Sequence, residues 1–270
     1  MSGTLAPEVL VLGGSGRVGS GVVAALLEAG SPVLAVGRDQ QKLEALAEAH
    51  ADEPGLEILA GSVADDRSAA RLAEAIVRRP RPLRAVVDAI AGPRRSARLL
   101  DRPVATLRRS LDQDLLPHLA AARHLLPVLQ AQARVGRYLL VGGPNARCGW
   151  AGYGHASVAG AATRMLAQVL HEEAPALGVR LQMLSIDAPV WTAENAPRAC
   201  AGWPSVLGVG RAAVSLLARE GKAGDGGVCV VPYGPGDASP PLRMLAWDYG
   251  DALRDACGRD PAGHDAGQAA

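Results

Sequence analysis

The amino-terminal part of the chain passes from a short apolar run directly into a glycine-rich turn and then into a helical pattern. Residues 8–12 (EVLVL) are followed by residues 13–19 (GGSGRVG), after which apolar residues recur at helical spacing. Glycines allow a tight turn and let bare backbone approach a pyrophosphate at the positive N-terminus of a helix. This order predicts a dinucleotide-binding βα unit, with a purely structural glycine loop as the alternative. The residues expected to bind the nucleotide here are Gly13, Ser15, Gly16, Arg17, Val18 and Gly19.

Short aliphatic runs alternate with longer helical patterns along the rest of the chain, which is typical of βαβ units and a parallel sheet. We expect strands at residues 8–12, 32–36, 56–59, 84–88, 137–141, 179–186 and 227–231. We expect the longest helices at residues 104–129 and 156–173, with a last helix at 206–220. The predicted fold is α/β, a doubly wound Rossmann fold with a seven-stranded parallel sheet flanked by helices. Residues 1–257 should form one domain, and the Gly-, Ala- and Asp-rich residues 258–270 a flexible tail.

The composition argues against several classes of function. A formal net charge of +1 over 270 residues gives no general electrostatic reason to bind nucleic acid or an anionic membrane. The 4 cysteines form no CxxC pair, so neither a disulfide framework nor a metal site is expected. The chain has no signal-peptide pattern and no apolar stretch of the roughly 18 residues that span a bilayer. We therefore expect a cytoplasmic protein that acts on a small-molecule substrate.

The end of the second predicted strand discriminates between the two nicotinamide cofactors. NAD-selective sites place a carboxylate there to accept the ribose hydroxyls, whereas this chain has Gly37 followed by Arg38. A guanidinium binds a 2′-phosphate with directional hydrogen bonds, so the sequence favours NADPH over NADH. The alternative is a solvated Arg38 paired with Asp39.

Over residues 9–232 the chain resembles the short-chain dehydrogenase/reductase family. The glycine turn has the spacing of the family's extended and atypical branches. Residues 61–65 (GSVAD) resemble the adenine-binding end of the family's third strand, with Ser62 where an aspartate is usual and Val63 beside it. Residues 89–92 (AIAG) stand where the family has Asn-Asn-Ala-Gly, and only Ala91 and Gly92 are retained.

Two further segments carry the resemblance. Asp114 stands where the family has a helix asparagine. Residues 186–192 (IDAPVWT) resemble the segment that approaches the nicotinamide carboxamide, and the resemblance implies that Pro189 and Thr192 contact the cofactor. It also implies a homodimer or homotetramer, usually built from the two long helices.

The catalytic motifs of the family are not retained. The family has a serine at the end of the fifth strand and then Tyr-x-x-x-Lys on the next helix, whereas the fifth strand here ends in residues 140–144 (LVGGP). At the family's spacing, His155 falls in the tyrosine position and Ala159 in the lysine position. The only lysines, Lys42 and Lys222, lie far from this helix in sequence. The chain is therefore interpreted as an atypical member without the usual proton relay.

Another group would have to supply the proton in a reductase. The candidates are His155, because histidine titrates near neutral pH, and the hydroxyls of Tyr153 and Ser96. A phenol or enol of the substrate is a further source, as in ketoreductases of aromatic polyketide pathways such as simocyclinone biosynthesis, a group with which the sequence is compatible. Structural roles in helix capping and packing are the alternatives for all three side chains.

Three functions remain open from the sequence: a ketoreductase with a non-standard proton donor, an NADPH-binding sensor or scaffold, and a non-redox enzyme such as a cyclase. The ketoreductase is preferred. Trp191 and Trp203 lie where the family builds its substrate lid, and they suit a flat, polycyclic aromatic ketone of the kind made in antibiotic biosynthesis. Packing of both indoles against the body is the alternative.

Overall fold

The computed structural model describes residues 6, 8–93, 96–192, 195–200, 202–219, 221, 223–224 and 227–234, without the side chain of Arg198. Seven strands form one parallel sheet in the order β3-β2-β1-β4-β5-β6-β7. They are β1 (Glu8–Leu12), β2 (Val33–Gly37), β3 (Leu56–Ala60), β4 (Leu83–Asp88), β5 (Gly136–Gly142), β6 (Val179–Ile186) and β7 (Val230–Tyr233). The predicted doubly wound fold is confirmed. The last strand begins three residues later than predicted, and residues 258–270 lie outside the described residues.

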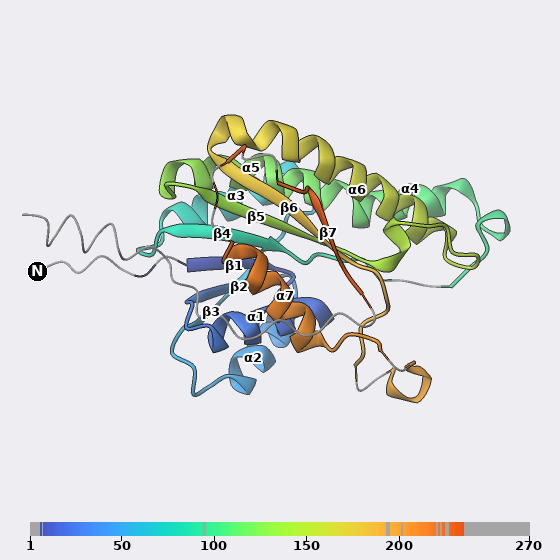
Figure 1. The fold of residues 1–270 in the computed structure, drawn as a ribbon, viewed down its shortest axis with the longest axis horizontal. Helices are drawn as coiled ribbons and strands as arrows, with labels where there is room; N and C mark the ends of the chain where they lie inside the picture. Colours follow the sequence, from blue (N-terminus) through green and yellow to red (C-terminus); the bar gives the residue numbers. More distant parts are fainter. Residues whose placement is uncertain are drawn as a thin grey trace, which may run out of the picture.

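Helices cover both faces of the sheet (Figure 1). One face carries α1 (Arg17–Glu28), α2 (Gln40–Ala49) and α7 (Val206–Leu217), and the other carries α3 (Asp66–Val77), α4 (Val104–Asp114), α5 (Leu116–Gln132) and α6 (Gly154–Glu173). In the described residues, the connections contain the short 3-10 helices η1 (Leu99–Asp101), η2 (Pro144–Ala146), η3 (Ala174–Leu177) and η4 (Ala196–Arg198). No helix within the described ranges is both long and apolar enough to cross a membrane.

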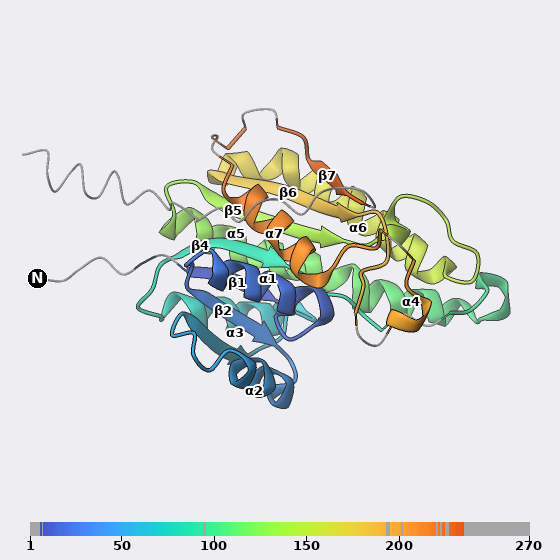
Figure 2. The same ribbon diagram turned by 60° about the horizontal axis from the view of Figure 1, so that its bottom comes forward.

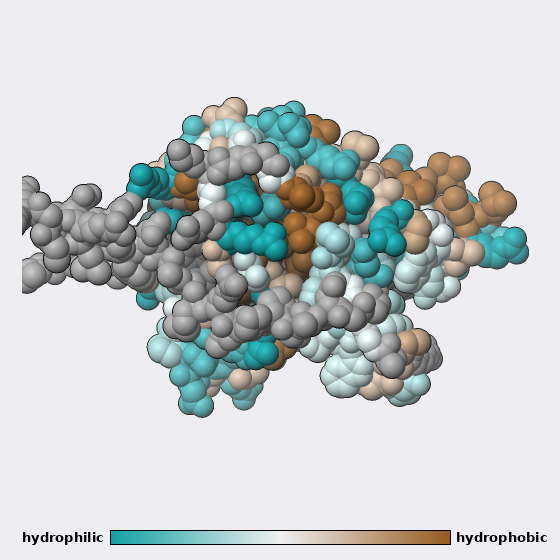
Figure 3. All heavy atoms as spheres, in the orientation of Figure 1, coloured by the Kyte–Doolittle hydropathy of each residue, from teal (hydrophilic) through white to brown (hydrophobic). Residues whose placement is uncertain are grey.

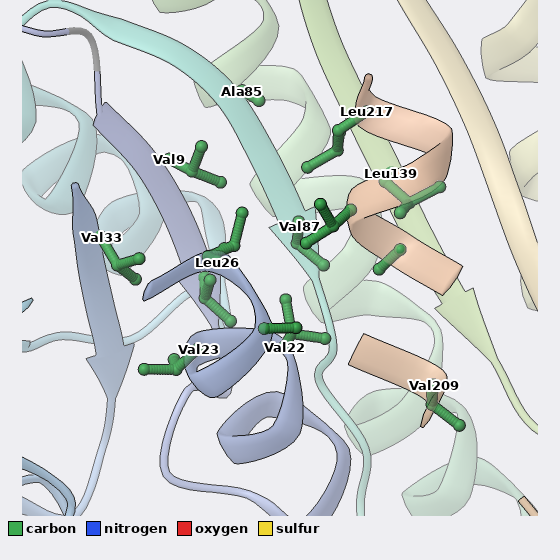
Figure 4. Packing of buried hydrophobic residues seen from close by; sticks show 14 of the residues in the cluster. Val9, Val22, Val23, Leu26, Val33, Ala85, Val87, Leu139, Val209 and Leu217 are labelled. Atoms are coloured by element: carbon green, nitrogen blue, oxygen red, sulfur yellow. The ribbon is translucent and has the colours of Figure 1, made fainter. Parts of the chain in front are cut away.

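Side chains of alternate residues in the central strands pack into two separate hydrophobic cores, one on each face of the sheet, as expected for strands buried on both faces. Val9 and Val11 of β1 pack with α1 and α7, while Leu10 and Leu12 pack with α3 and α5. Figure 4 shows the first core, in which side chains of α1 and α7 meet those of β1, β2, β4 and β5.

Helices α1 and α7 pack closely because each has a glycine at the contact. A Cβ added to Gly210 of α7 would overlap the carbonyl oxygen of Gly21 in α1, and a Cβ on Gly21 would overlap Val206. Figure 2 shows the two helices side by side in front of the sheet. The start of α7 is thereby fixed against the helix that follows the glycine-rich turn.

One helix prediction is wrong. The segment 104–129 was expected as one helix, but the chain breaks at Leu115 (φ −118, ψ −56), so that α4 ends at Asp114 and α5 begins at Leu116. Pro117 in the first turn of α5 contributes to the break, since proline suits the start of a helix and has no N–H for a helix interior. The break matters for the site, because it places Asp114 at a helix end.

Candidate functional site

The strand order reverses between β1 and β4, and the loops that follow these two strands face each other across that point. Ligands of open α/β sheets bind at such a switch point, outside the carboxyl ends of the strands. The loop after β1 is the glycine-rich turn, and the loop after β4 is residues 89–92. Both were predicted as cofactor-binding segments, and the fold brings them together: the amide of Ala89 donates to the carbonyl of Leu12 at 3.1 Å.

The glycine-rich turn is too tight for side chains at several positions. Gly13 has φ +71, in the left-handed region that favours glycine, and a Cβ on it would lie 2.9 Å from the carbonyl oxygen of Ala89. The amide of Gly16 donates back to the carbonyl of Gly13 at 2.8 Å, and a Cβ on Gly19 would overlap that same carbonyl group. Steric exclusion of side chains is therefore sufficient to explain glycine at these positions.

The N-terminus of α1 is not neutralised from within the helix. Gly16 is its N-cap residue and provides no side-chain cap, and the first turn contains no acidic residue. The first backbone N–H groups of a helix have no intrahelical acceptor and carry a partial positive charge. Val18 is half-buried, and Arg17 begins the helix with an exposed side chain. This end of α1 is chemically suited to an anionic group.

Near the end of β2 lie the hydroxyl of Ser15, Gly37 without a side chain, and the cationic Arg38. A Cβ on Gly37 would lie 3.0 Å from Ser15 Oγ, so the missing side chain makes room for that hydroxyl. Arg38 is exposed and forms no ion pair with another described residue. The expected competitor, Asp39, instead caps α2 by accepting from the amide of Lys42, and its carboxylate lies 3.8 Å from the Lys42 ammonium. The Arg38 guanidinium is therefore available to an anion.

The end of β3 is shaped by Ser62. Its hydroxyl accepts a hydrogen bond from the amide of Ala64 at 3.1 Å, a local turn that serine and aspartate side chains both make. Val63 is buried against the core shared by α3 and α5. Serine at this position therefore preserves the turn, and Val63 anchors the segment.

A buried polar cluster lies beneath the loop after β4, and the sequence analysis missed it. Asp88, the last residue of β4, is completely buried. Its Oδ2 accepts from the hydroxyl of Tyr138 in β5 at 2.9 Å and lies 2.8 Å from Nδ1 of His118 in α5. Its Oδ1 accepts from the amide of Ile90 at 3.3 Å. The sequence offers one indication of this cluster, which is the carboxylate at the end of the otherwise apolar β4. A buried carboxylate requires hydrogen-bond partners, so its position predicts polar neighbours.

The cluster shifts the pKa values of its members. Burial alone lowers the pKa of His118, but the charge of Asp88, the hydrogen bond to it and the charge of Asp114 outweigh burial and raise it above 6.5. Burial, followed by the charge and hydrogen bond of Asp88, raises the pKa of Tyr138 well above its usual range. The neighbouring carboxylates therefore favour the protonated form of His118, and burial beside Asp88 favours the neutral phenol of Tyr138.

Asp114 supports the other end of the same loop. Its Oδ1 accepts from the amide of Gly92 at 2.6 Å, and its backbone carbonyl accepts from the hydroxyl of Thr163 in α6 at 2.9 Å. Gly92 has no room for a side chain, because a Cβ there would lie 2.6 Å from Asp114 Oδ1. The retained glycine and the aspartate therefore form one contact between loop and helix. Ala91, between the two supported amides, is exposed.

The predicted catalytic residues gather where α6 begins. His155, in its first turn, is 9% exposed, and its imidazole forms no hydrogen bond within the described part of the chain. Tyr153 is the N-cap residue, 36% exposed, with its ring edge-on to Trp150 at 6.4 Å between centroids. The hydroxyl of Ser96 donates to the carbonyl of Gly152 at 3.2 Å, so Ser96 joins the loop after β4 to this turn.

The positions that would carry the family's serine and lysine have no such groups. Gly142 ends β5, and a Cβ on it would overlap the terminal methyl of Met183, so even a small side chain requires that methionine to move. Ala159 is completely buried in α6. Lys42 lies on α2, and Lys222 lies outside the described residues.

The segment after β6 is closed into a loop by backbone contacts. Trp191 pairs with Ser205 in an isolated bridge, which brings the end of the segment back beside its start just before α7. Thr192 is half-buried, and its amide donates to the side chain of Asn195 at 2.8 Å. Trp191 is 45% exposed, whereas Trp203 is half-buried. Pro189 is half-buried and lies three residues after the end of β6, on the sheet edge where the other loops gather.

Two other features lie away from this edge. No group of three or more histidine, cysteine or acidic side chains in the described ranges is suited to a metal ion. A small cavity, of about 200 Å³ of empty space including open solvent, is lined by residues of β5, β6 and α7 that precede the carboxyl ends of the strands. It is separate from the glycine-rich turn, so we place no function there.

Comparison with known proteins identifies the family. The model of the short chain dehydrogenases matches residues 7–193. The chain belongs to the short chain dehydrogenase family. No curated protein matches its sequence.

Solved structures of the family share the whole architecture. A short-chain type dehydrogenase/reductase from Mycobacterium ulcerans superposes with a TM-score of 0.75 at 20% identity, covering 94% of this chain and 98% of that one. An oxidoreductase of the family from Burkholderia thailandensis gives a TM-score of 0.72 at 25% identity, with 94% and 98% covered. An NADPH-bound short chain oxidoreductase from Pseudomonas aeruginosa PAO1, described as containing an atypical catalytic center, gives 0.73 at 21% identity, with 86% and 96% covered.

Proposed function

We propose that this protein is an NADPH-dependent ketoreductase whose proton donor is not the family's tyrosine–lysine pair. The observation that carries the proposal is the anion-binding surface at the switch point: an uncapped α1 N-terminus, the Ser15 hydroxyl beside Gly37, and the exposed Arg38. The similar protein from Pseudomonas aeruginosa PAO1 is described as NADPH-bound.

The described residues fit NADPH rather than NADH. The glycine positions that a Cβ would block leave bare backbone for a pyrophosphate, and Arg38 without a carboxylate partner suits a 2′-phosphate. When bound, the nicotinamide supplies the hydride. We assign to the cofactor site Gly13, Ser15, Gly16, Arg17, Val18, Gly19, Arg38, Ser62, Val63, Ala91, Gly92, Pro189 and Thr192.

We assign the proton donation to His155, with Tyr153 as the second candidate. His155 falls in the position of the family's tyrosine, is nearly buried, and has no competing hydrogen bond among the described residues. The hydroxyl of Ser96 already donates to a backbone carbonyl, which makes Ser96 a supporting residue. A phenol or enol of the substrate is the remaining source.

A hydrophobic, polycyclic aromatic ketone of the polyketide type is the proposed substrate class. Trp191 exposes 45% of its surface on the segment that joins β6 to α7, and Trp203 lies near the other end of that segment. Indole faces bind flat aromatic molecules well. We therefore place the protein with the ketoreductases of antibiotic biosynthesis, acting after the polycyclic skeleton has formed.

Turnover experiments test the assignment. We expect NADPH to be oxidised only when a polycyclic aromatic ketone is present, and His155→Gln to lower kcat by roughly a hundredfold or more, since a general acid contributes about 10²–10⁴-fold. Tyr153→Phe is the matched variant and should retain most of the rate. Near-normal rates in both variants would assign the proton to the substrate.

A non-catalytic NADPH-binding sensor is the second candidate, because Ala159 and Gly142 leave the family's catalytic positions without functional groups. Such a protein would bind NADPH and consume none with any ketone. A non-redox enzyme such as a cyclase would convert substrate without consuming NADPH. Measurement of both NADPH and substrate in one reaction separates the three functions.

We also propose that the protein forms a homodimer or homotetramer through α5 and α6. These helices expose large apolar side chains that a soluble monomer would leave in water: Leu116, Leu119, Val158, Met165 and Val169. Figure 3 shows hydrophobic residues among hydrophilic ones on one face of the molecule. Sedimentation of the full chain tests the assembly, and a monomer at micromolar concentration would contradict it.

A further inference from the structure

The loop after β4 is held from below by two carboxylates. Asp88 Oδ1 accepts from the amide of Ile90 at 3.3 Å, and Asp114 Oδ1 accepts from the amide of Gly92 at 2.6 Å. Both amides therefore point toward the protein interior, while Ala91 between them is exposed. The conformation of residues 89–92 depends on where these two carboxylates lie.

The same loop touches the glycine-rich turn. The Ala89 amide donates to the carbonyl of Leu12 at 3.1 Å, and the Ala89 carbonyl lies so close to Gly13 that a Cβ there would be 2.9 Å from its oxygen. A displacement of the loop is therefore transmitted to the turn by direct contact, because closely packed backbone cannot absorb it.

Among the described residues of this cluster, His118 is the group that can carry a positive charge. Its Nδ1 lies 2.8 Å from Asp88 Oδ2, and the charge of Asp114 also acts on it. The neighbouring elements contribute Asp88 from β4, Asp114 from α4 and the neutral Tyr138 from β5. The parts of α3 and β6 that face this core contribute apolar side chains, including Leu72, Ile76 and Leu181.

We propose that His118 is a positioning residue for the nucleotide site, which in its protonated form holds Asp88 in place beneath residues 89–92 and offsets the charge of Asp114. The affinity for the nucleotide should then fall when His118 loses its proton. This inference rests on the proposed function, because it assumes that residues 89–92 face a bound nicotinamide nucleotide.

The physical cause is charge compensation in a buried space. With His118 protonated, one cation offsets two carboxylates. Once the proton has left for solvent, the completely buried Asp88 and the half-buried Asp114 remain at the two ends of a four-residue loop without that compensating cation. Loss of the compensating charge is costly at Asp88, because solvent screens this completely buried carboxylate very little. The loop then relaxes, and residues 89–92 lose the arrangement that contacts Gly13.

The matched variants are His118→Asn and His124→Asn. Asparagine at 118 keeps a short N–H donor for Asp88 but cannot carry the charge. His124 lies on the same helix, and its Nε2 is 2.9 Å from the carboxylate of the exposed Asp66, so it controls for the loss of a histidine–aspartate pair in α5.

The experiment measures the NADPH dissociation constant by calorimetry from about pH 6.5 to about pH 9, together with the NMR titration of the His118 ring. We expect the wild-type affinity to fall about tenfold, with a midpoint that matches the ring titration, since coupling between sites commonly amounts to about 5–150-fold. His118→Asn should bind weakly at every pH, and His124→Asn should follow the wild type. A wild-type affinity that stays constant while the His118 ring titrates would overturn the proposal.

A second measurement needs no nucleotide. Hydrogen exchange of the Gly92 and Ile90 amides, corrected for the intrinsic effect of pH, should accelerate in His118→Asn and not in His124→Asn. Unchanged exchange at both amides would overturn the role of His118 even if NADPH binds. Failure of the wild type to bind NADPH at any pH, with accelerated exchange in the variant, would instead contradict the proposed function and leave the support of the loop by His118 in place. If His118→Asn does not fold, the wild-type pH series decides the question.

Discussion

Replacing Arg38 with alanine removes the cation that we assign to the 2′-phosphate of NADPH. Arg38 follows Gly37 at the end of β2, is exposed, and forms no ion pair with another described residue. The substitution therefore leaves no unpaired carboxylate behind and disturbs no core contact. Its effect should be confined to the nucleotide that carries the extra phosphate.

The magnitude follows from exposure and charge. Hydrogen bonds to charged groups contribute about 1.5–3 kcal/mol in protected settings, and exposed ion pairs about 0.2–1 kcal/mol. Arg38 is exposed but would meet a phosphate with a charge of about −1.5 to −2, so we expect an intermediate loss of about 1–1.5 kcal/mol. This corresponds to a weakening of NADPH binding by about five- to tenfold.

Calorimetry with NADPH and NADH on both proteins measures this. The variant should lose its preference for NADPH and bind NADH as the wild type does, and added salt should reduce the wild-type preference. Lys42→Ala is the control, because Lys42 is a nearby cation already paired with Asp39 at 3.8 Å. An equal loss of affinity for both nucleotides, or no loss for NADPH, would refute the assignment. No binding of either nucleotide by the wild type would refute the proposed function.

Three further predictions concern stability. Gly210→Ala should lower the free energy of unfolding by about 2 kcal/mol. Overpacking against Gly21 of α1 costs about 3 kcal/mol, and the higher helix propensity of alanine offsets about 1 kcal/mol of this. An unchanged midpoint of urea denaturation would contradict the close helix contact. Tyr138→Phe should lower the free energy of unfolding by about 2 kcal/mol, because it removes a buried hydrogen-bond donor to Asp88. The same urea denaturation measures this. A decrease of less than about 0.5 kcal/mol would mean that the hydroxyl does not stabilise the fold. Because the folded-state pKa of His118 is raised, protonation of His118 contributes its full stabilisation below about pH 6.5, and this stabilisation is lost as the pH rises through the folded-state pKa. The melting temperature of the wild type should therefore fall as the pH rises across this range. A melting temperature that does not fall would exclude a buried imidazolium.

Local sequence patterns were sufficient for the fold. Continuous apolar runs such as β1 predict strands buried on both faces, and a strand, a glycine turn and a helix in succession predict the first βα unit. These signals are local because each element must satisfy its own backbone hydrogen bonds and bury its own apolar face. The same reasoning failed at Leu115, where the apolar helical pattern continues across a break to which Pro117 contributes, and where Asp114 contacts the loop after β4 and α6.

The position of the candidate cofactor residues at one edge of the sheet was likewise predictable, because the glycines and Arg38 lie at strand ends and parallel strands bring their carboxyl ends to one edge. The partner of Asp39 was not predictable. Asp39 can pair with Arg38 or cap α2, and the geometry of the helix start decides for the cap.

The sequence by itself determined the elements, their order and the edge of the sheet where a ligand would bind. The tertiary structure decided which polar side chains meet below that edge. His118 and Tyr138 lie 30 and 50 residues after Asp88 in the chain, so no spacing rule connects these side chains. They become partners only when β4, β5 and α5 pack together, because burial then excludes water and leaves each polar group no other partner than its neighbours.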